Sequence, residues 1–580
     1  METSAILRFD TKRSFICDCK EQTKKMLRWL SSMTDSRPLG SVGGARKFAA
    51  SLDRDIFSAA DTVCSQLRAF ASEAEQQDTL SAAPLLELDV KLEPTTLRVE
   101  RDYLAASLQS HSLRERLWDT GYDWSMRFAD AYRLIIMREA ASLAARSTTE
   151  FARAAARFFW FRTMAYRFRL YRHEEWVPSI WVETHQVFRK TCDLGVDHVV
   201  VPDGSVSAGN AAATTYPARV FAALLLLRLG NAGGYTPSQI HALYRKIDEF
   251  TYDIRLTARP AADDGFAVNL AGSEGLVPRH AVPQGGQFLY CDTAAIHSRA
   301  LAWLDQVESE DGGRNVTLGG SLSQNPLLAL RSAVLRIDPE FKPLARASTR
   351  NDDRGRVAAT YGVTKVATAI SFDPGVLAAS LEGENYDYVD AAEIETLGML
   401  KDSTIKKLRR DLPPEAGRLN LQFWHLRDRS DTGYRCVMPN TSTQRLRLRD
   451  IAVVTEESPV AGWQVATVVR LLKLPAGHIE LGLQVLSRDV DMIELSTLRS
   501  RNGLYRDNAA TMVASAVFRA IRLKSAFLGR PIMGSSWIMN TADYQASVVY
   551  EVQGSSRRYE ASEIVSEGSD WVWVKPNEVS

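Results

Sequence analysis

The sequence is poor in cysteine, and this scarcity excludes a disulfide-built fold. Six cysteines are spread over 580 residues, and only Cys17 and Cys19 lie close together. A single C-x-C pair without a second pair is a weak signature for a zinc site. Scattered cysteines at this density suit a reducing compartment, where disulfides are rare.

Net charge and long apolar runs are also lacking. The formal net charge is +1, which argues against a surface built throughout for DNA or for anionic membranes. The longest apolar run, VFAALLLL at 220–227, is far shorter than the roughly 20 residues that span a bilayer. The N-terminus METSAILRFD has no basic stretch followed by an apolar one, so no signal peptide is expected. We therefore expect a cytoplasmic protein without a transmembrane segment.

Familiar catalytic motifs are missing as well. The sequence contains no P-loop, no H-E-x-x-H, no G-x-S-x-G and no Cys-His zinc pattern. We expect no enzymatic activity, and hence no catalytic residue, no metal and no cofactor. What is present is an ordinary globular composition, with 45% hydrophobic and 24% charged residues. At this length the chain is too long for one hydrophobic core, so several domains are expected.

The first 340 residues show mainly helical periodicity. Residues 1–50 are polar and Gly/Ser-rich, which predicts a flexible arm, and 51–340 are predicted to form a helical array or bundle. The clearest unit lies around Gly233 and Gly234, which end one predicted helix. Thr236 then caps the next, and Gln239 completes a capping box.

After residue 340 the pattern changes to short strands. Apolar alternation at 419–427, 434–439, 445–456, 462–474 and 477–488, broken by Gly, Pro or Asn, is typical of a small antiparallel barrel. We assign 341–490 to this barrel, with a charged helical insertion at about 373–417, and 491–580 to a β-rich C-terminal extension. Within the extension, residues 509–528 are predicted to form a helix. The predicted fold class is therefore α+β and multidomain.

One predicted strand pair carries a polar turn of defined pattern. Asp428, Ser430 and Gly433 form D-x-S-x-x-G between the runs at 419–427 and 434–439. Asp, Ser and Gly are also favoured turn residues for backbone reasons, so a plain hairpin turn is the simplest interpretation. The position at the tip of a barrel strand pair favours a ligand contact.

Just before the first barrel strand stands a basic segment. It spaces arginines as R-x-x-x-R twice, at Arg346, Arg350 and Arg354. Taken alone, this spacing is equally typical of a charged linker.

Together the two motifs resemble the PilZ domain, the bacterial receptor module for cyclic di-GMP. In that family an R-x-x-x-R segment precedes a β-barrel that carries a [D/N]-x-S-x-x-G turn. The resemblance covers about 346–490, and it implies a ligand site formed by Arg350, Arg354, Asp428, Ser430 and Gly433. Arg346 is the alternative arginine of the basic motif. It also implies a non-catalytic receptor that relays nucleotide binding to a partner protein controlling motility, attachment or exopolysaccharide. The helical region looks like that of larger family members but carries no motif of its own.

The chemistry suits this ligand. Cyclic di-GMP has two phosphates and two guanines, and the planar guanidinium of arginine binds phosphate or the O6/N7 edge of guanine. The Asp428 carboxylate can accept from guanine N–H groups, and Ser430 can add a hydroxyl bond. Gly433 would let the backbone pass close beneath the base.

One departure from the family leaves alternatives open. Arg354 and Asp428 are 74 positions apart, which is longer than the family's spacing. Either the helical piece is an insertion within the barrel, or the basic motif is Lys406 and Arg410 in KKLRR. A protein-interaction scaffold with a degenerate barrel that binds no nucleotide is the alternative function. A nucleic-acid regulator using the Arg/aromatic helix at 153–172 is a further one, and it requires a contiguous basic face there.

Overall fold

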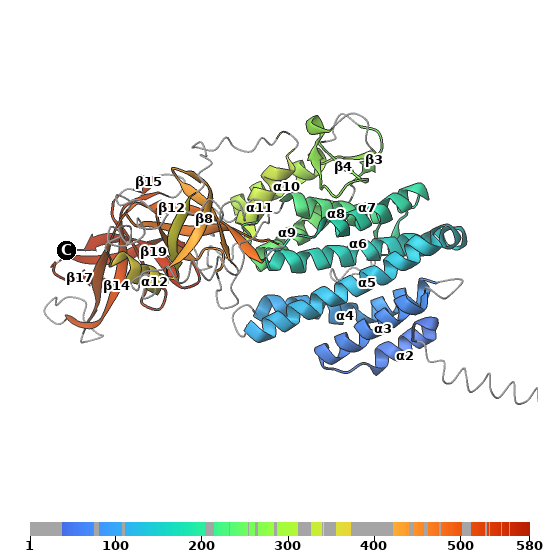
Figure 1. Ribbon diagram of the computed structural model, residues 1–580, viewed down its shortest axis with the longest axis horizontal. Coiled ribbons are helices and arrows are strands. Elements are labelled where there is room, and N and C mark those ends of the chain that lie inside the picture. Colours follow the sequence, from blue (N-terminus) through green and yellow to red (C-terminus); the bar gives the residue numbers. More distant parts are fainter. Residues whose placement is uncertain are drawn as a thin grey trace, which may run out of the picture. The chain divides into compact units, whose positions relative to one another are not determined.

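The computed structural model describes most of the chain (Figure 1). The described residues are 38–74, 81–106, 111–202, 214–230, 233–252, 254–260, 265–282, 287–310, 326–338, 340, 355–372, 421–439, 446–456, 462–474, 477–500, 512–527, 531–532, 534–546, 548–555 and 557–579. Most of the predicted arm at 1–50 and all of the predicted insertion at 373–417 lie outside these ranges. The domain boundaries assigned from the sequence stay predictions.

The chain divides into two compact units. The first comprises Met1–Phe168, Ser179–Leu224 and Leu270–Ser273, and the second comprises Arg169–Pro178, Leu225–Asn269 and Glu274–Ser580. The α+β multidomain class predicted from the sequence is confirmed, with helices followed by a barrel and a further β-sheet. In the described part of the chain, no helix combines the length and apolarity needed to cross a bilayer.

Helices make up most of the first unit. They are η1 (Pro38–Gly40), α2 (Val42–Ser51), α3 (Ile56–Ala74), α4 (Ala83–Ala105), α5 (His111–Arg146), α6 (Thr148–Tyr171), α7 (Pro178–Asp193) and the start of α8 (Pro217–Gly230), with a two-stranded sheet of β1 (Val201–Pro202) and β2 (Thr214–Thr215). The Ser41 hydroxyl caps α2 by accepting from the Gly44 N–H at 3.0 Å. A helix thus lies inside the stretch that the sequence assigned to an arm.

The second unit begins with helices around a small sheet. These are α9 (Pro237–Phe250), α10 (Ala294–Glu310), α11 (Pro326–Ile337) and strands β3 (Leu256–Thr257), β4 (Phe266–Asn269), β5 (Val277–Pro278) and β6 (Phe288–Cys291) in the order β3-β6-β4-β5, with η4 (Arg279–Ala281) between β5 and β6. The predicted capping box of α9 is confirmed, because the Thr236 hydroxyl accepts from the Gln239 N–H and the Gln239 side chain accepts from the Thr236 N–H.

A closed six-stranded antiparallel barrel follows, in the strand order β10-β11-β12-β9-β8-β7. Its strands are β7 (Arg356–Tyr361), β8 (Gln422–Ser430), β9 (Gly433–Pro439), β10 (Ile451–Glu456), β11 (Gln464–Lys473) and β12 (His478–Ser487). The strands predicted from alternation are confirmed to within a few residues, apart from the later start of β10. Their inward side chains, such as Trp424, Cys436 and Leu481, are buried and fill the barrel.

A C-terminal sheet covers part of the barrel. Its order is β13-β17-β18-β19-β16-β14-β15, with β13 (Asp489–Ser500), β14 (Met512–Phe527), β15 (Pro531–Ile532), β16 (Ser536–Asn540), β17 (Val549–Val552), β18 (Arg558–Glu567) and β19 (Trp571–Val579). Helix α12 (Val363–Ile370), residues of β7, β10 and β11, and strands β14, β16 and β19 share one core. The prediction that the C-terminal region is rich in β-structure is therefore confirmed.

The helix predicted at 509–528 is wrong, because β14 occupies 512–527. Ile521 and Leu523 enter the core shared with the barrel, while Ala520 enters a second core on the other face of the sheet. Arg519 and Lys524 of this strand are exposed, and its mixture of small, apolar and charged residues is equally typical of a helix.

Candidate functional site

The polar turn lies at the tip of the β8–β9 hairpin. Ser430 pairs with Gly433, so Asp431 and Thr432 form a two-residue turn. The Ser430 hydroxyl donates to the Gly433 carbonyl at 3.4 Å, and the Arg488 guanidinium donates to the Asp431 carbonyl at 2.8 Å. The predicted strand–turn–strand geometry is thus confirmed, whereas the ligand role of these residues stays a prediction.

Gly433 is required by its neighbour strand rather than by the turn. A Cβ at this position would lie 2.3 Å from the Leu483 carbonyl oxygen of β12. The φ angle of Gly433 is not in the left-handed region, so no unusual turn conformation is involved. Glycine here allows β9 and β12 to approach closely and keeps the hairpin flat against the barrel.

A single row of residues crosses four barrel strands beside this turn. Asp428 of β8 pairs with Arg435 of β9, Arg435 pairs with Gly482 of β12, and Gly482 pairs with Arg470 of β11. The residues that alternate with the row fill the barrel core, namely Tyr434, Cys436, Leu471, Leu481 and Leu483. Because successive side chains of a strand point to opposite faces, the row lies on the outside of the barrel. We call it the cross-strand row.

Ion pairs connect the row. The Arg435 guanidinium lies 3.6 Å from the Asp428 carboxylate and 2.7 Å from Glu480, and Glu480 lies 3.9 Å from Arg470. Both acidic side chains are 10% exposed, while the side chains of Arg435 and Arg470 are 40% and 48% exposed. The hydrogen bond to Glu480 is the main cause that raises the pKa of Arg435 above its ordinary value. Arg435 therefore stays charged, and both arginines present their guanidinium groups to solvent.

Gly482 lies between the two arginines, and Arg470 packs closely against it. A Cβ there would lie 2.9 Å from the Arg470 Cβ. The row therefore requires glycine at this position. Phosphate oxygens suit the guanidinium groups on either side of it.

The basic motif lies outside the described residues at all three of its positions, Arg346, Arg350 and Arg354. Its point of attachment is described. The Gly355 carbonyl accepts from the Leu426 N–H at 2.9 Å, and Arg356 pairs with His425 where β7 runs antiparallel to β8. Lys406 and Arg410 of the alternative motif also lie outside the described residues.

His425, next to this attachment point, adds no charge to the face. Burial, with smaller contributions from Arg356 and His478, lowers its pKa to about 4. The imidazole is therefore neutral near pH 7 and contributes no positive charge.

The sequence missed four residues of the row and its network, namely Arg435, Arg470, Glu480 and Gly482. Strand alternation could have placed Arg435, Glu480 and Gly482 on the outer face, since each lies between buried apolar residues. Arg470 follows the exposed Val469 at a register irregularity of β11, so alternation does not place it. The register between strands, which brings them into one row, has no local sequence signal.

The Arg/aromatic helix does not form a basic face. In the first unit Arg157, Arg162 and Arg167 of α6 are at most 6% exposed. Arg157 binds Asp89 with two bonds of 2.6 Å, and Arg167 lies 2.9 Å from Glu100, with both acids on α4. The nucleic-acid reading required solvent-exposed arginines here and is wrong, because acidic residues buried against α6 neutralise them.

Among the described residues, no cluster of three or more His, Cys, Asp or Glu side chains is placed to hold a metal ion. Residues 45–261 match the family described as "Cyclic-di-GMP receptor FimW, N-terminal domain". The helical region is thus similar to the N-terminal domain of a cyclic-di-GMP receptor family.

This match confirms the resemblance to cyclic-di-GMP receptors on a part of the chain that the motifs did not cover. It spans less than half of the 580 residues and ends before the barrel. Comparison with curated proteins and with solved structures gave no match.

Proposed function

We propose that the protein is a non-catalytic receptor that binds cyclic di-GMP on the outer face of the barrel, over the cross-strand row. Arg350 and Arg354, with Arg346, hold phosphate or guanine. Asp428 and Ser430 contact a guanine edge, and Gly433 keeps the hairpin flat beneath it. The family match at 45–261 supports this ligand, because it names a cyclic-di-GMP receptor.

The observation that supports the site best is the bond between Gly355 and Leu426. Gly355 directly follows Arg354 in the sequence, and its partner Leu426 is two positions before Asp428. At about 3.3 Å per residue, Arg350 is at most roughly 16 Å of chain from Gly355. The 74 positions between Arg354 and Asp428 are therefore compatible with a site that both motifs share.

Binding requires the charge network to open. In the free protein Asp428 is held by Arg435, which is also held by Glu480. A phosphate over Gly482 would draw Arg435 and Arg470 away from Glu480 and release Asp428 for guanine. The arginine segment then closes over the ligand, and the altered segment relays binding to a partner protein that controls motility, attachment or exopolysaccharide.

A second candidate function is a protein-interaction scaffold whose barrel has lost the nucleotide. The observation that favours it is the same network, since Arg435 already forms ion pairs with both Asp428 and Glu480. In that case the outer face is a closed structural feature and the helical region carries the function.

Hydrogen exchange of the full chain with and without cyclic di-GMP separates the two candidates. The receptor proposal predicts added protection in peptides covering 345–357, 421–439 and 478–487, and none in α6. An Asp428→Asn variant should lose that protection. Unchanged exchange over all three peptides at saturating nucleotide would support the scaffold.

A further inference from the structure

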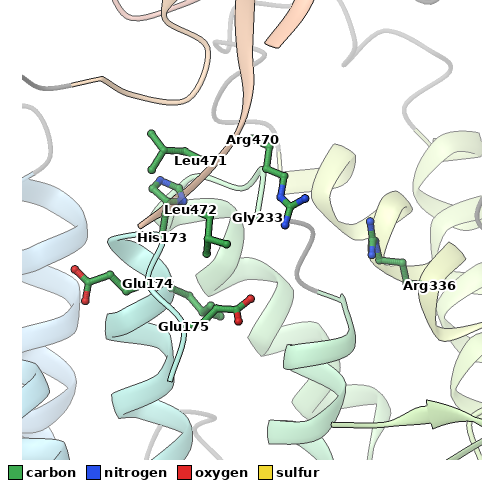
Figure 2. Close-up of a pocket in the computed structure, with 9 residues that line it drawn as sticks. His173, Glu174, Glu175, Gly233, Arg336, Arg470, Leu471 and Leu472 are labelled. Carbon is green, nitrogen blue, oxygen red and sulfur yellow. The ribbon is translucent and has the colours of Figure 1, made fainter. Parts of the chain in front are cut away.

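A cavity of about 180 Å³ lies inside the second unit, and Arg470 of the cross-strand row is part of its lining (Figure 2). It is bounded by the segment after α6, by the loop before α9, by the last turn of α11 and by the end of β11. Its lining includes His173, Glu174, Gly233, Arg336 and Arg470.

Backbone hydrogen bonds fix the walls of this cavity. The Lys473 N–H donates to the His173 carbonyl at 2.8 Å, and the Leu471 N–H donates to the Gly233 carbonyl at 3.2 Å. His173 and Gly233 have φ angles of 58° and 70°, in the left-handed region. The two walls thus depend on specific backbone turns that hold β11 in place, and the cavity is part of the fold.

Two guanidinium groups enter the cavity from different elements. Figure 2 shows the side chains of Arg470 and Arg336 extending into the space between β11 and α11. A side chain at Gly233 would crowd Arg470, since a Cβ there would lie 3.4 Å from its Nε. Among the residues that the structure describes, Arg336 makes no ion pair. The ion pair between Arg470 and Glu480 is long, at 3.9 Å.

The acidic residues of the cavity do not neutralise this pair. Glu174 is held by Arg169 at 2.8 Å and by Lys473 at 3.8 Å, and in Figure 2 its carboxylate lies on the side away from Arg336 and Arg470. Glu175 is exposed to solvent. The half-buried side between α11 and β11 therefore carries an excess of positive charge that an anion would balance.

We propose that this cavity binds a phosphate group between Arg336 and Arg470. Paired guanidinium forks from two elements suit a tetrahedral oxyanion with several acceptor oxygens. The volume admits inorganic phosphate or the phosphate end of a nucleotide but not a whole cyclic dinucleotide. The site is separate from the proposed receptor site except for Arg470, so Arg336 is the residue that tests it.

Equilibrium dialysis of the full chain against labelled inorganic phosphate, and separately against GMP, gives the test. We expect saturable binding of at least one probe, weakened tenfold or more by Arg336→Gln, and not changed by Arg245→Gln, an exposed arginine on α9 outside the cavity. Binding of GMP alone would assign the site to a nucleotide phosphate, and binding of both to the phosphate group itself.

Two results would overturn the proposal: no saturable binding of either probe by the folded chain, or equal binding by wild type and Arg336→Gln. Circular dichroism of each variant establishes that it is folded. Because Arg336 is not part of the cross-strand row, cyclic di-GMP affinity should be unchanged in Arg336→Gln. Failure of this site and failure of the receptor site are therefore distinguishable.

Discussion

Neutralising Glu480 should strengthen cyclic di-GMP binding. Its carboxylate contacts Arg435 at 2.7 Å and Arg470 at 3.9 Å, and it competes with the ligand's phosphates for both guanidinium groups. Glu480→Gln keeps the shape and a hydrogen-bond acceptor for Arg435 but removes one negative charge. The variant therefore changes the charge of the face with little change in its geometry.

The size of the effect follows from the exposure of the face. Arg435 is 40% exposed, so a water-like dielectric constant applies. A carboxylate about 7 Å from two phosphate charges then repels them by roughly 1 kcal/mol in total. Its removal should tighten binding about fivefold in low salt, and less as ionic strength rises.

Calorimetric titration of wild type, Glu480→Gln and Glu494→Gln measures this difference. Glu494 lies on β13 of the C-terminal sheet, outside the cross-strand row, and its side chain is 55% exposed, so it controls for net charge. Equal affinity of wild type and a folded Glu480→Gln, or a loss of affinity, would refute the reasoning that the row holds the phosphates.

Three further predictions concern the stability of the two units. Arg157→Met should destabilise the helical region by about 3–5 kcal/mol, because the Asp89 carboxylate, which is 1% exposed, loses its arginine partner. Adding Asp89→Leu should restore most of the lost stability. Urea unfolding followed by circular dichroism measures both changes. Gly433→Ala should lower the free energy of unfolding by about 1–3 kcal/mol, because the new Cβ would clash with a carbonyl of β12. Gly462→Ala, where no atom lies within 4 Å of the new Cβ, should change it little in the same assay. Equal unfolding midpoints of the two variants would contradict this. Burial raises the pKa of Asp450 to about 6. The protonated side chain therefore contributes its full stabilisation below about pH 4, and this contribution is lost as the pH rises toward 6. Asp450→Asn should remove this pH-dependent loss, and melting temperatures of both proteins at pH 4 and pH 7 test it.

Local signals were enough to predict the elements nearest the candidate site. Thr236 and Gln239 mark a helix start because capping involves only neighbouring backbone groups. The hairpin at Asp431 and Thr432 was predictable for the same reason, since turn residues act on their own backbone. Alternation located β8, β9, β11 and β12 because one face of each is buried in the barrel.

What the sequence could not give depends on contacts between distant segments. The burial of Arg157 has no local signal, because its partner Asp89 lies 68 positions earlier, on another helix. The cross-strand row requires the register of four strands, and Arg470 of that row is 42 positions from Asp428. The bond from Leu426 to Gly355 likewise joins the two motif regions only after the barrel closes.

A calorimetric titration of cyclic di-GMP into the full chain tests the central claim most directly, with Arg354→Ala and Asp428→Ala as variants. The receptor account predicts saturable binding by wild type that each substitution weakens tenfold or more, which corresponds to about 1.4 kcal/mol. No heat of binding from a folded wild-type chain would contradict it. So would equal affinities of all three proteins, because the nucleotide would then bind elsewhere than at these two motifs.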